Sequence, residues 1–384
     1  MQRIISLGLL AALLGGGWSY FQGFSASDLK RVAQTVGQVA QQGAQPQATS
    51  GGFAPAGSFA PNQPSYTPYG QQVAPQPQVG FGPTPSQTRL PTIRIATFNI
   101  QTFGNSKSRK PHVMQALAHV IRLFDVVAIQ EIRTKDDYFI PKFLRDYVNQ
   151  APGVAYDALV SSRLGRTASK EQYAFIYNTA KIETAPGFSF VTPDPEDRLH
   201  REPHVALFRT RIQPVDRAFT FALMNIHTDP DLVKTDGVKE PNELDALYDF
   251  YRMVQQTPFG GGYEDDVILL GDLNTGVPAR GPHTPNERSR SLLRSDLRLL
   301  AKVPGIRPLI LDQATNTRGH RLHDNLLIPT NATSEYTGSS GVIDLQSLFR
   351  ITQDQAKQIS DHLPVWGEFS AVESTSLGRV ASRP

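Results

Sequence analysis

A long stretch without charge near the N-terminus limits which part of this chain can fold. No charged residue lies between Arg31 and Arg89, and 26 of the 48 residues from Gln41 to Thr88 are Gln, Pro or Gly. Such a segment buries too little apolar surface to offset the conformational entropy that folding would cost. We therefore interpret residues 28–88 as a disordered, flexible linker with polyproline II character, with an SH3-type ligand or a wall-binding spacer as the alternative. The folded part is then residues 89–384.

The first 27 residues have the pattern of an export signal. Arg3 precedes an apolar run from Ile4 to Leu14, and the small residues Ser25-Ala26-Ser27 follow as a candidate cleavage sequence. The segment from Ile4 to Ser27 also carries no charge, which leaves an uncleaved membrane anchor as the competing interpretation. We expect residues 1–27 to be a signal peptide or an anchor. The protein would then be secreted or periplasmic, or membrane-anchored and facing outside the cytoplasm.

The composition of the chain excludes several classes of protein. It contains no Cys, which rules out a disulfide scaffold, a zinc finger, a thiolate-bound iron–sulfur cluster and a cysteine nucleophile. The formal net charge is +3, with 38 Lys and Arg against 35 Asp and Glu, too small to indicate nucleic-acid binding by itself. Four of these charges precede residue 89 (Arg3, Asp28, Lys30 and Arg31), so residues 89–384 carry 35 basic and 34 acidic side chains. Any positive surface on this domain must therefore be local.

Apolar periodicity in residues 89–384 alternates between that of strands and that of helices. Thr92–Ile100 is rich in β-branched residues and predicts a strand, and Asp125–Ile129 predicts a second, buried one. Between them, Pro111 opens a segment whose apolar residues recur at helical spacing. A second amphipathic helix is marked by Leu244, Leu247, Tyr248, Tyr251 and Val254. Further strands are predicted at Tyr173–Tyr177, Val205–Arg211, Phe219–Ile226, Asp266–Leu270, Asn325–Ile328 and Pro364–Phe369. The pattern predicts one mixed α/β domain and leaves the strand order open.

The predicted strands run into polar residues that are able to bind a metal or transfer a proton. They are Asn99 and the polar residues of four motifs: Gln130-Glu131, Asn225-Ile226-His227, Gly271-Asp272-Leu273-Asn274 and, before the last strand, Asp361-His362. Each has an ordinary explanation when taken alone, because Gly-Asp-x-Asn is good turn chemistry and a lone histidine is commonly structural. In α/β sheets, however, ligands bind beyond the carboxyl ends of the strands. The joint occurrence therefore predicts that these side chains converge on one site.

The order of these motifs resembles that of the endonuclease/exonuclease/phosphatase superfamily. The matching motifs are Phe98-Asn99, Gln130-Glu131, Asn225-Ile226-His227, Gly271-Asp272-Leu273-Asn274 and Ser360-Asp361-His362. Two further blocks, Lys170-Glu171-Gln172-Tyr173 and Arg201-Glu202-Pro203, narrow the resemblance to its deoxyribonuclease I branch. The similarity extends from about Arg94 to Phe369. It implies a four-layer α/β sandwich, in which two mixed β-sheets pack together and helices flank them. It also implies an endonuclease that hydrolyses phosphodiester bonds in DNA with little sequence preference.

The resemblance further implies a role for each residue in these motifs. His227 and His362 would form the acid/base pair of the reaction, oriented by Glu171 and Asp324 respectively. Metal ligation would fall mainly to Glu131, assisted by Asn99, Asp272, Asn274 and Asp361. Phosphate groups of the DNA would be held by Arg133, Arg201, Arg166 and Lys170. DNA is the implied partner and no obligate protein partner is inferred; a membrane is involved only if residues 1–27 remain as an anchor.

These residue types suit phosphodiester hydrolysis on chemical grounds alone. Two histidines, which titrate near neutral pH, can remove a proton from water and supply one to the leaving oxygen, each typically worth about 10²–10⁴-fold in rate. A carboxylate beside each imidazole holds its tautomer and stabilises its cation. Oxygen ligands without Cys favour a hard cation, Mg²⁺ or Mn²⁺, with Ca²⁺ as a further candidate. The expected protein is a metal-dependent hydrolase.

Departures from the family pattern leave other functions open. Ser169 stands where the animal enzymes have a tyrosine that packs in the minor groove, and Asn325 follows Asp324 where an arginine is usual. The disulfides of the secreted animal enzymes are missing as well. The alternatives are a sphingomyelinase-like or phosphoinositide-phosphatase-like phosphoesterase, a nuclease toxin subunit, or a non-catalytic surface binding protein on the same fold.

Overall fold

The computed structural model describes residues 90–166, 170–233, 242–259, 262–280 and 289–374. The predicted signal peptide or anchor (1–27), the predicted linker (28–88) and Ser169 lie outside the described residues. Within the described ranges, no helix is both long enough and apolar enough to cross a membrane. The described residues belong to the predicted catalytic domain, 89–384, whose boundaries stay a prediction.

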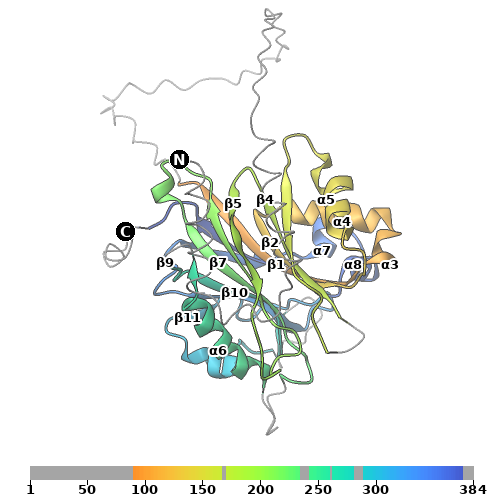
Figure 1. Ribbon diagram of the computed structural model, residues 1–384. Helices are drawn as coiled ribbons and strands as arrows, with labels where there is room; N and C mark the ends of the chain where they lie inside the picture. The colour runs from red at the N-terminus through yellow and green to blue at the C-terminus, as the bar shows by residue number, and fades with distance from the viewer. Residues whose placement is uncertain (1–89, 167–169, 234–241, 260–261, 281–288, 375–384) are drawn as a thin grey trace, which may run out of the picture. The chain divides into compact units, whose positions relative to one another are not determined.

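Two six-stranded sheets form the centre of the domain (Figure 1). The first contains, in spatial order, β13 (Tyr336–Val342), β14 (Val365–Ser370), β1 (Thr92–Phe103), β2 (Val126–Ile132), β4 (Gln172–Asn178) and β3 (Tyr156–Val160). The second contains β11 (Ile306–Pro308), β12 (Arg321–Pro329), β10 (Val267–Pro278), β7 (Thr220–His227), β6 (His204–Thr210) and β5 (Ile182–Val191). Both sheets are mixed, because β1 and β2 pair in parallel, as do β7 and β10, while the other neighbours pair antiparallel.

Helices cover the outer face of each sheet (Figure 1). The first sheet is covered by α3 (Asn105–Ser108), α4 (Pro111–Ile121), α5 (Phe139–Asp146), α7 (Leu345–Phe349) and α8 (Gln353–Ile359). The second is covered by α6 (Glu243–Gln255) and the 3-10 helix η3 (Arg294–Lys302). The shorter elements are η1 (Val148–Gln150), η2 (Val215–Arg217) and the hairpin of β8 (Pro258–Phe259) and β9 (Gly262–Tyr263). The arrangement confirms the expected four-layer sandwich of two mixed sheets flanked by helices.

Two apolar cores hold the layers together, and the alternation of strand residues divides the side chains between them. On β1, Ile93 and Ile95 are buried against the second sheet, whereas Ala96, Phe98 and Ile100 are buried against the helices of the first. Strand side chains point to opposite faces with a period of two, so a central strand covered on both faces is apolar throughout. This explains why neighbouring residues such as Ile95 and Ala96 are both apolar although they belong to different cores.

The helices form where the sequence supplies both an apolar face and a suitable start. Pro111 occupies the first turn of α4, where its missing N–H costs nothing, and Leu117 is among the residues that α4 buries. Asn242 caps α6 by accepting a hydrogen bond from the backbone N–H of Leu244. Both helices are therefore encoded locally, as their periodicity predicts.

The structure extends some predicted elements and adds others. The strand predicted at Asp266–Leu270 continues as β10 to Pro278, and the one predicted at Val205–Arg211 is β6, His204–Thr210. The edge strands β3, β5, β11 and β13 and the short helices α5, α7 and α8 were not predicted. Edge and short elements depend more on tertiary packing than on local pattern.

Candidate active site

The carboxyl ends of the two parallel strand pairs bring the polar strand-end residues together. Asn99 and Gln130 are neighbours in the β1–β2 register, and His227 and Asp272 are neighbours in the β7–β10 register. The two pairs meet between the sheets, where Nδ2 of Asn99 donates a 3.0 Å hydrogen bond to Oδ2 of Asp272. Both side chains are buried. The motifs therefore lie together in space, as the strand-end pattern predicts.

Gly271 makes the close approach of β7 and β10 possible just before Asp272. Its φ is +146°, and a Cβ at this position would collide with the carbonyl oxygen of Ile226. Only glycine both accepts this conformation and leaves the space free. The Gly-Asp motif thus places the Asp272 carboxylate beside the end of β7.

A buried amide pair forms the floor of the site. Nε2 of Gln130 donates to Oδ1 of Asn225 at 2.6 Å, across the two sheets, and Nδ2 of Asn225 donates to the carbonyl of Ile129 at 3.1 Å. Both amides are fully buried, so their polar atoms need these partners. The pair ties β2 to β7 directly beneath the catalytic candidates.

Each candidate catalytic histidine is bonded to a buried carboxylate. Nδ1 of His227 lies 2.7 Å from Oε1 of Glu171, and Nδ1 of His362 lies 2.8 Å from Oδ2 of Asp324. Because an ionised carboxylate only accepts, each Nδ1 donates its proton and each Nε2 is turned the other way. The two Nε2 atoms lie 3.6 Å and 3.7 Å from the same oxygen, Oδ2 of Asp272. The two imidazoles therefore face each other across one carboxylate.

These carboxylates favour the charged form of both histidines. Burial opposes the imidazolium, but Asp324 and Asp272 outweigh it and raise the pKa of His362 to about 10. Burial likewise opposes the cation of His227, and Glu171 raises its pKa above the ordinary value. Burial also opposes ionisation of Asp272, yet the two histidines lower its pKa to about 2. The cationic form of each imidazole and the ionised form of Asp272 therefore favour each other.

Thr315 also anchors Asp324, at the same carboxylate oxygen that bonds His362. The Thr315 hydroxyl donates to Oδ2 of Asp324 at 2.8 Å and accepts the backbone N–H of Asp324 at 3.0 Å. His323, the residue before Asp324, places its ring 5.6 Å from the ring of His362, and burial lowers the pKa of His323. A neutral ring next to His362 adds little repulsion to the imidazolium.

The predicted metal ligand Glu131 lies in a strained segment at the end of β2. Its φ is +62°, and two other non-glycine residues at the site, Thr102 and Asn274, have φ values of +49° and +48°. Left-handed backbone is uncommon outside glycine and gathers at functional sites. Oε2 of Glu131 accepts the backbone N–H of Thr102 at 2.9 Å, while Nε2 of Gln101 donates to Oδ2 of Asp361 at 2.8 Å. The end of β1 therefore orients both carboxylates.

Several oxygen atoms at the site fit a hard cation. Oδ1 of Asn99, Asp324 and Asp361 are buried and, within the described part of the chain, accept no hydrogen bond. Leaving such atoms without a partner is costly, and Mg²⁺, Mn²⁺ and Ca²⁺ all prefer oxygen ligands. Single ligand atoms of Asp272, Asp324 and His362 also lie within 4.8 Å of one another. The acidic and amide groups present here are thus able to hold a divalent ion.

The remaining predicted ligand and the two nearer arginines have protein partners. Asn274 donates from Nδ2 to the carbonyl of Thr228 at 2.8 Å. Arg133 lies 3.4 Å from both Glu131 and Glu171, with a third of its side chain exposed. Arg201 is buried, and its guanidinium donates to the carbonyls of His227 and Thr228 at 3.0 and 3.2 Å. Arg201 therefore supports the end of β7, and its predicted contact with a phosphate stays a prediction.

The other two predicted phosphate contacts lie farther out. Arg166 forms an ion pair of 2.8 Å with Asp197, and Lys170 is exposed at the start of the segment that carries Glu171. A backbone bridge between Leu164 and Glu171 brings these residues to the same loop. Their contact with DNA stays a prediction.

Sequence reasoning missed three contributors to the site. Gln101 orients Asp361, Thr315 anchors Asp324, and His323 packs beside His362. The sequence offered a signal for Gln101, which is two residues after Asn99 on the same strand, and for His323, which precedes Asp324. It offered none for Thr315, because that residue reaches Asp324 only through the pairing of its loop with β12.

Comparison with known proteins identifies similar chains. The profile of the Endonuclease/Exonuclease/phosphatase family matches residues 96–362. Deoxyribonuclease-1 of Rattus norvegicus is 30% identical over 281 residues, which cover 71% of this chain and 90% of the relative. Deoxyribonuclease gamma of Homo sapiens is 26% identical over 279 residues, which cover 71% of this chain and 84% of the relative. A solved endonuclease/exonuclease/phosphatase family protein from Bacteroides thetaiotaomicron, 16% identical, aligns with 75% of this chain and 100% of its own, with a TM-score of 0.45.

Proposed function

This chain belongs to the endonuclease/exonuclease/phosphatase family, and on that basis we propose that it is a metal-dependent endonuclease that hydrolyses phosphodiester bonds in DNA with little sequence preference. Family membership and relatives named as deoxyribonucleases support a hydrolase acting on phosphodiester bonds. What we propose beyond this is that the phosphodiester bonds are those of DNA. It is supported by the names of those relatives, about 25–30% identical over most of their length.

The observation that carries the proposal is the pair of carboxylate-bound histidines facing Asp272. Hydrolysis forms a bond between a water oxygen and phosphorus and breaks the bond between phosphorus and the leaving oxygen. One histidine, in its neutral form, accepts the proton that the attacking water loses, and the other, as its imidazolium, donates a proton to the leaving oxygen. Glu171 accepts a hydrogen bond from the Nδ1–H of His227, and Asp324 accepts one from the Nδ1–H of His362. The Nε2 atom of each ring is therefore the one that exchanges a proton with water or with the leaving oxygen.

Other residues of the chain would bind the substrate and the ion. Glu131, Asn99, Asp272 and Asp361 would hold Mg²⁺ or Mn²⁺, with Ca²⁺ as a further candidate and Asn274 alongside. The ion would stabilise negative charge on the phosphate oxygens. Arg133, which is partly exposed between Glu131 and Glu171, would contact the same phosphate.

Nicking of supercoiled plasmid tests this proposal. We expect the wild type to nick in Mg²⁺ and to stop when a chelator is added. His227→Ala and His362→Ala should each lose about 10²–10⁴-fold in rate. His112→Ala is the matched control, because His112 is exposed on α4. Undiminished nicking by both active-site variants would rule the assignment out.

The same preparations separate the alternatives. A sphingomyelinase-like or phosphoinositide-phosphatase-like enzyme would release phosphocholine or inorganic phosphate without nicking plasmid. A non-catalytic binding protein would retain DNA or another partner without turnover. If the His227→Ala and His362→Ala variants both lost that release of phosphate, the active site would be the one described here, but its substrate would not be DNA.

We also propose that the chain is exported and that residues 89–384 form the catalytic domain. The apolar run from Ile4 to Leu14 after Arg3 supports export, and the charge-free segment between Arg31 and Arg89 supports the boundary. N-terminal sequencing of the mature protein distinguishes cleavage near Ser27 from an uncleaved anchor. Limited proteolysis should stop at a fragment beginning near Arg89.

A further inference from the structure

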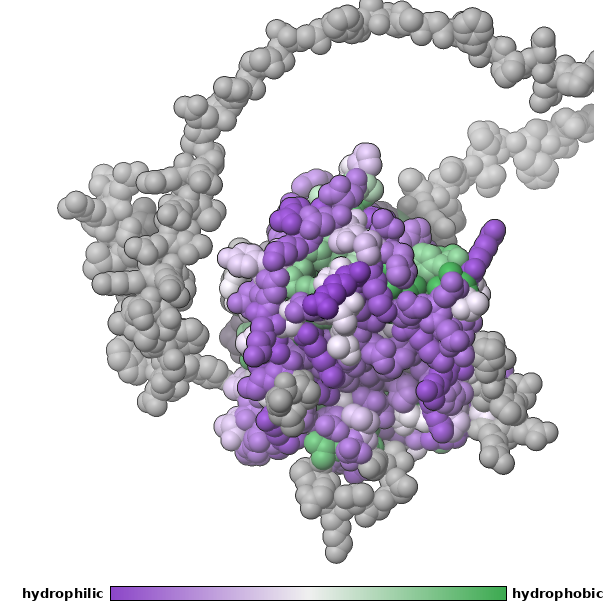
Figure 2. Space-filling model, turned by 90° about the vertical axis from the view of Figure 1, so that its right-hand side faces the viewer, coloured by the Kyte–Doolittle hydropathy of each residue, from purple (hydrophilic) through white to green (hydrophobic). Residues whose placement is uncertain are grey.

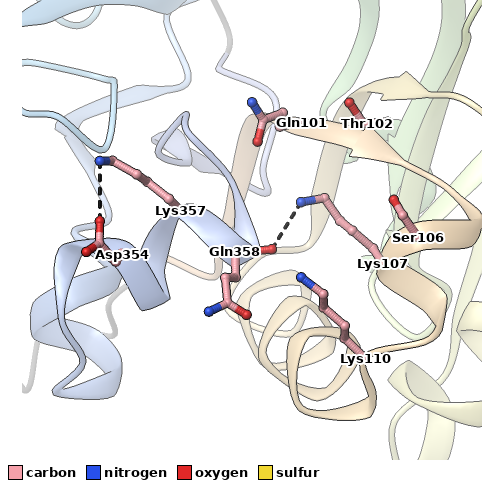
Figure 3. Close-up of a pocket in the computed structure, with 8 residues that line it drawn as sticks. All are labelled: Gln101, Thr102, Ser106, Lys107, Lys110, Asp354, Lys357 and Gln358. Carbon is pink, nitrogen blue, oxygen red and sulfur yellow. Dashed lines mark hydrogen bonds and ion pairs between the residues drawn. The ribbon is translucent and has the colours of Figure 1, made fainter.

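A pocket of about 300 Å³ lies beside the candidate active site, between the end of β1 and α8. Figure 3 shows Lys107 and Lys110 on the segment between β1 and α4, and Lys357 on α8 with its ammonium turned toward Asp354. Gln101, Thr102 and Ser106 complete this part of the wall. None of these residues belongs to the predicted phosphate contacts.

This cavity, here named the lysine pocket after Lys107, Lys110 and Lys357, is predominantly positive. Its single acid, Asp354, lies 3.6 Å from the ammonium of Lys357. Among the described residues, neither Lys107 nor Lys110 forms an ion pair with an acid. The side chain of Lys107 is 7% exposed and uses one of its three N–H donors on the carbonyl of Gln358, at 3.1 Å. Burial, followed by the nearby charge of Lys110, lowers the pKa of Lys107 to about 8, with Asp361 acting in the opposite direction.

The pocket shares a wall with the candidate metal site. Gln101 donates to Asp361 and the backbone N–H of Thr102 donates to Glu131, and both of these donors line the pocket. The surface that carries α3, α4 and α8 is mostly hydrophilic (Figure 2). An anion seated between Lys107 and Lys110 would therefore lie next to the reacting phosphate, on a face suited to a polar ligand.

We propose that the lysine pocket is a subsite for a second, non-scissile phosphate of the polynucleotide, held by Lys107 and Lys110 with Lys357 at its edge. This inference rests on the proposed nuclease function and adds to it. Successive phosphates in duplex DNA follow each strand at about 3.4 Å of helix axis, so a strand in the active site presents further phosphates close by. Such contacts position the duplex without reading its bases. A nearly neutral domain thus gains local affinity for DNA.

The lysine pocket also explains how a domain with nearly balanced charge can present positive charge to DNA at one place. A lysine ammonium acts as a point charge that tolerates varied phosphate orientations, and the exposed Lys110 would do so beside the fixed ammonium of Lys107, which suits an enzyme with little sequence preference. Two ammoniums in one pocket repel each other, and a bound phosphate removes that repulsion. The subsite would act on DNA affinity, and hence on KM, more than on the chemical step.

Salt-dependent kinetics on duplex DNA test the subsite. The variant is Lys110→Gln, because Lys110 is exposed and its replacement leaves the buried Lys107 in place. We expect KM to rise about fivefold or more. The slope of log KM against log salt concentration should fall by about 0.9, the value for one lost phosphate contact. Lys110→Arg should keep most of the wild-type affinity.

Two controls separate this subsite from general charge and from the chemistry. Lys302→Gln removes one exposed charge on η3, over the other sheet, and should leave KM and its salt slope unchanged. Bis(p-nitrophenyl) phosphate has no neighbouring phosphate, so the loss of kcat/KM in Lys110→Gln should be at least fivefold larger on DNA than on this diester.

The possible outcomes distinguish the two proposals. A wild-type protein that does not cut DNA overturns the nuclease function and the subsite together. A wild type that cuts DNA, with a Lys110→Gln variant whose KM and salt slope match those of Lys302→Gln, overturns the subsite alone. Equal losses on DNA and on the small diester would likewise overturn it, because they would place Lys110 in the chemical step.

Discussion

Asn99 and Asp272 are joined by a 3.0 Å hydrogen bond between their side chains, one from each sheet of the sandwich. They are separated by 173 positions in the sequence, and each lies near the carboxyl end of a parallel strand pair. The contact draws the Asp272 carboxylate to the middle of the site, where Nε2 of both histidines lies within 3.7 Å of the same oxygen, Oδ2. The active site therefore exists only when both sheets are packed.

Replacing Asp272 by Asn should uncouple the two histidines. The anion of Asp272 contributes to the raised pKa of His362, so its loss should lower that pKa from about 10 toward the ordinary value. We expect Asp272→Asn to lose at least about 10²-fold in kcat. NMR titration of the His362 ring in metal-free protein measures the pKa directly. An unchanged titration midpoint would contradict the role of Asp272.

The stability of the metal-free protein should fall with rising pH because of His362. Its pKa is about 10 in the folded state and about 6.5 when unfolded, so the folded state binds the proton more tightly. The contribution is full below pH about 6.5 and is lost as pH rises toward 10. Thermal unfolding in chelator should show a Tm decline over this window at least about 4 °C larger than in His362→Gln. Parallel curves for the two proteins would refute this.

Glu131 should control metal affinity. Binding of Mg²⁺ or Mn²⁺ to the folded state alone raises stability by about 2.7 kcal/mol at one hundred times Kd. Removing the Glu131 charge in Glu131→Gln should reduce the metal-induced rise in Tm by half or more at the same metal concentration. Glu196→Gln, an exposed acid paired with Arg198, is the control and should keep the wild-type rise. Equal rises in all three proteins would place the ion elsewhere.

Arg201 should matter for stability more than for DNA binding. Its buried guanidinium bonds the carbonyls of His227 and Thr228 and lies 3.5 Å from Glu171. Arg201→Met leaves the Glu171 carboxylate with one charged partner fewer, so we expect a loss of at least about 2 kcal/mol in urea unfolding. Arg166→Met, at an exposed ion pair, should lose less than about 1 kcal/mol. A stable Arg201→Met protein with a raised KM for DNA would instead support a phosphate contact.

Local pattern predicted the elements that carry the catalytic candidates. The β-branched run before Asn99, the apolar run before Gln130 and the Gly-Asp motif after Leu270 are each readable within about ten residues. The helical spacing that begins at Pro111 is equally local. The strands among them are buried on both faces, so they form continuous apolar runs that stand out in the sequence. Edge strands such as β3 and β13 are half exposed, and their pattern is correspondingly weak.

The sequence by itself determined which strand ends carry acids, amides and histidines, and the order of those motifs indicated the family. Tertiary structure alone decided the pairings: Asn99 with Asp272, Thr315 with Asp324, and the meeting of Lys107 and Lys110 with Lys357 in one pocket. Periodicity and turn chemistry act between neighbours along the chain. Contacts between the sheets, and between the end of β1 and α8, depend on how whole layers pack, which no local segment encodes.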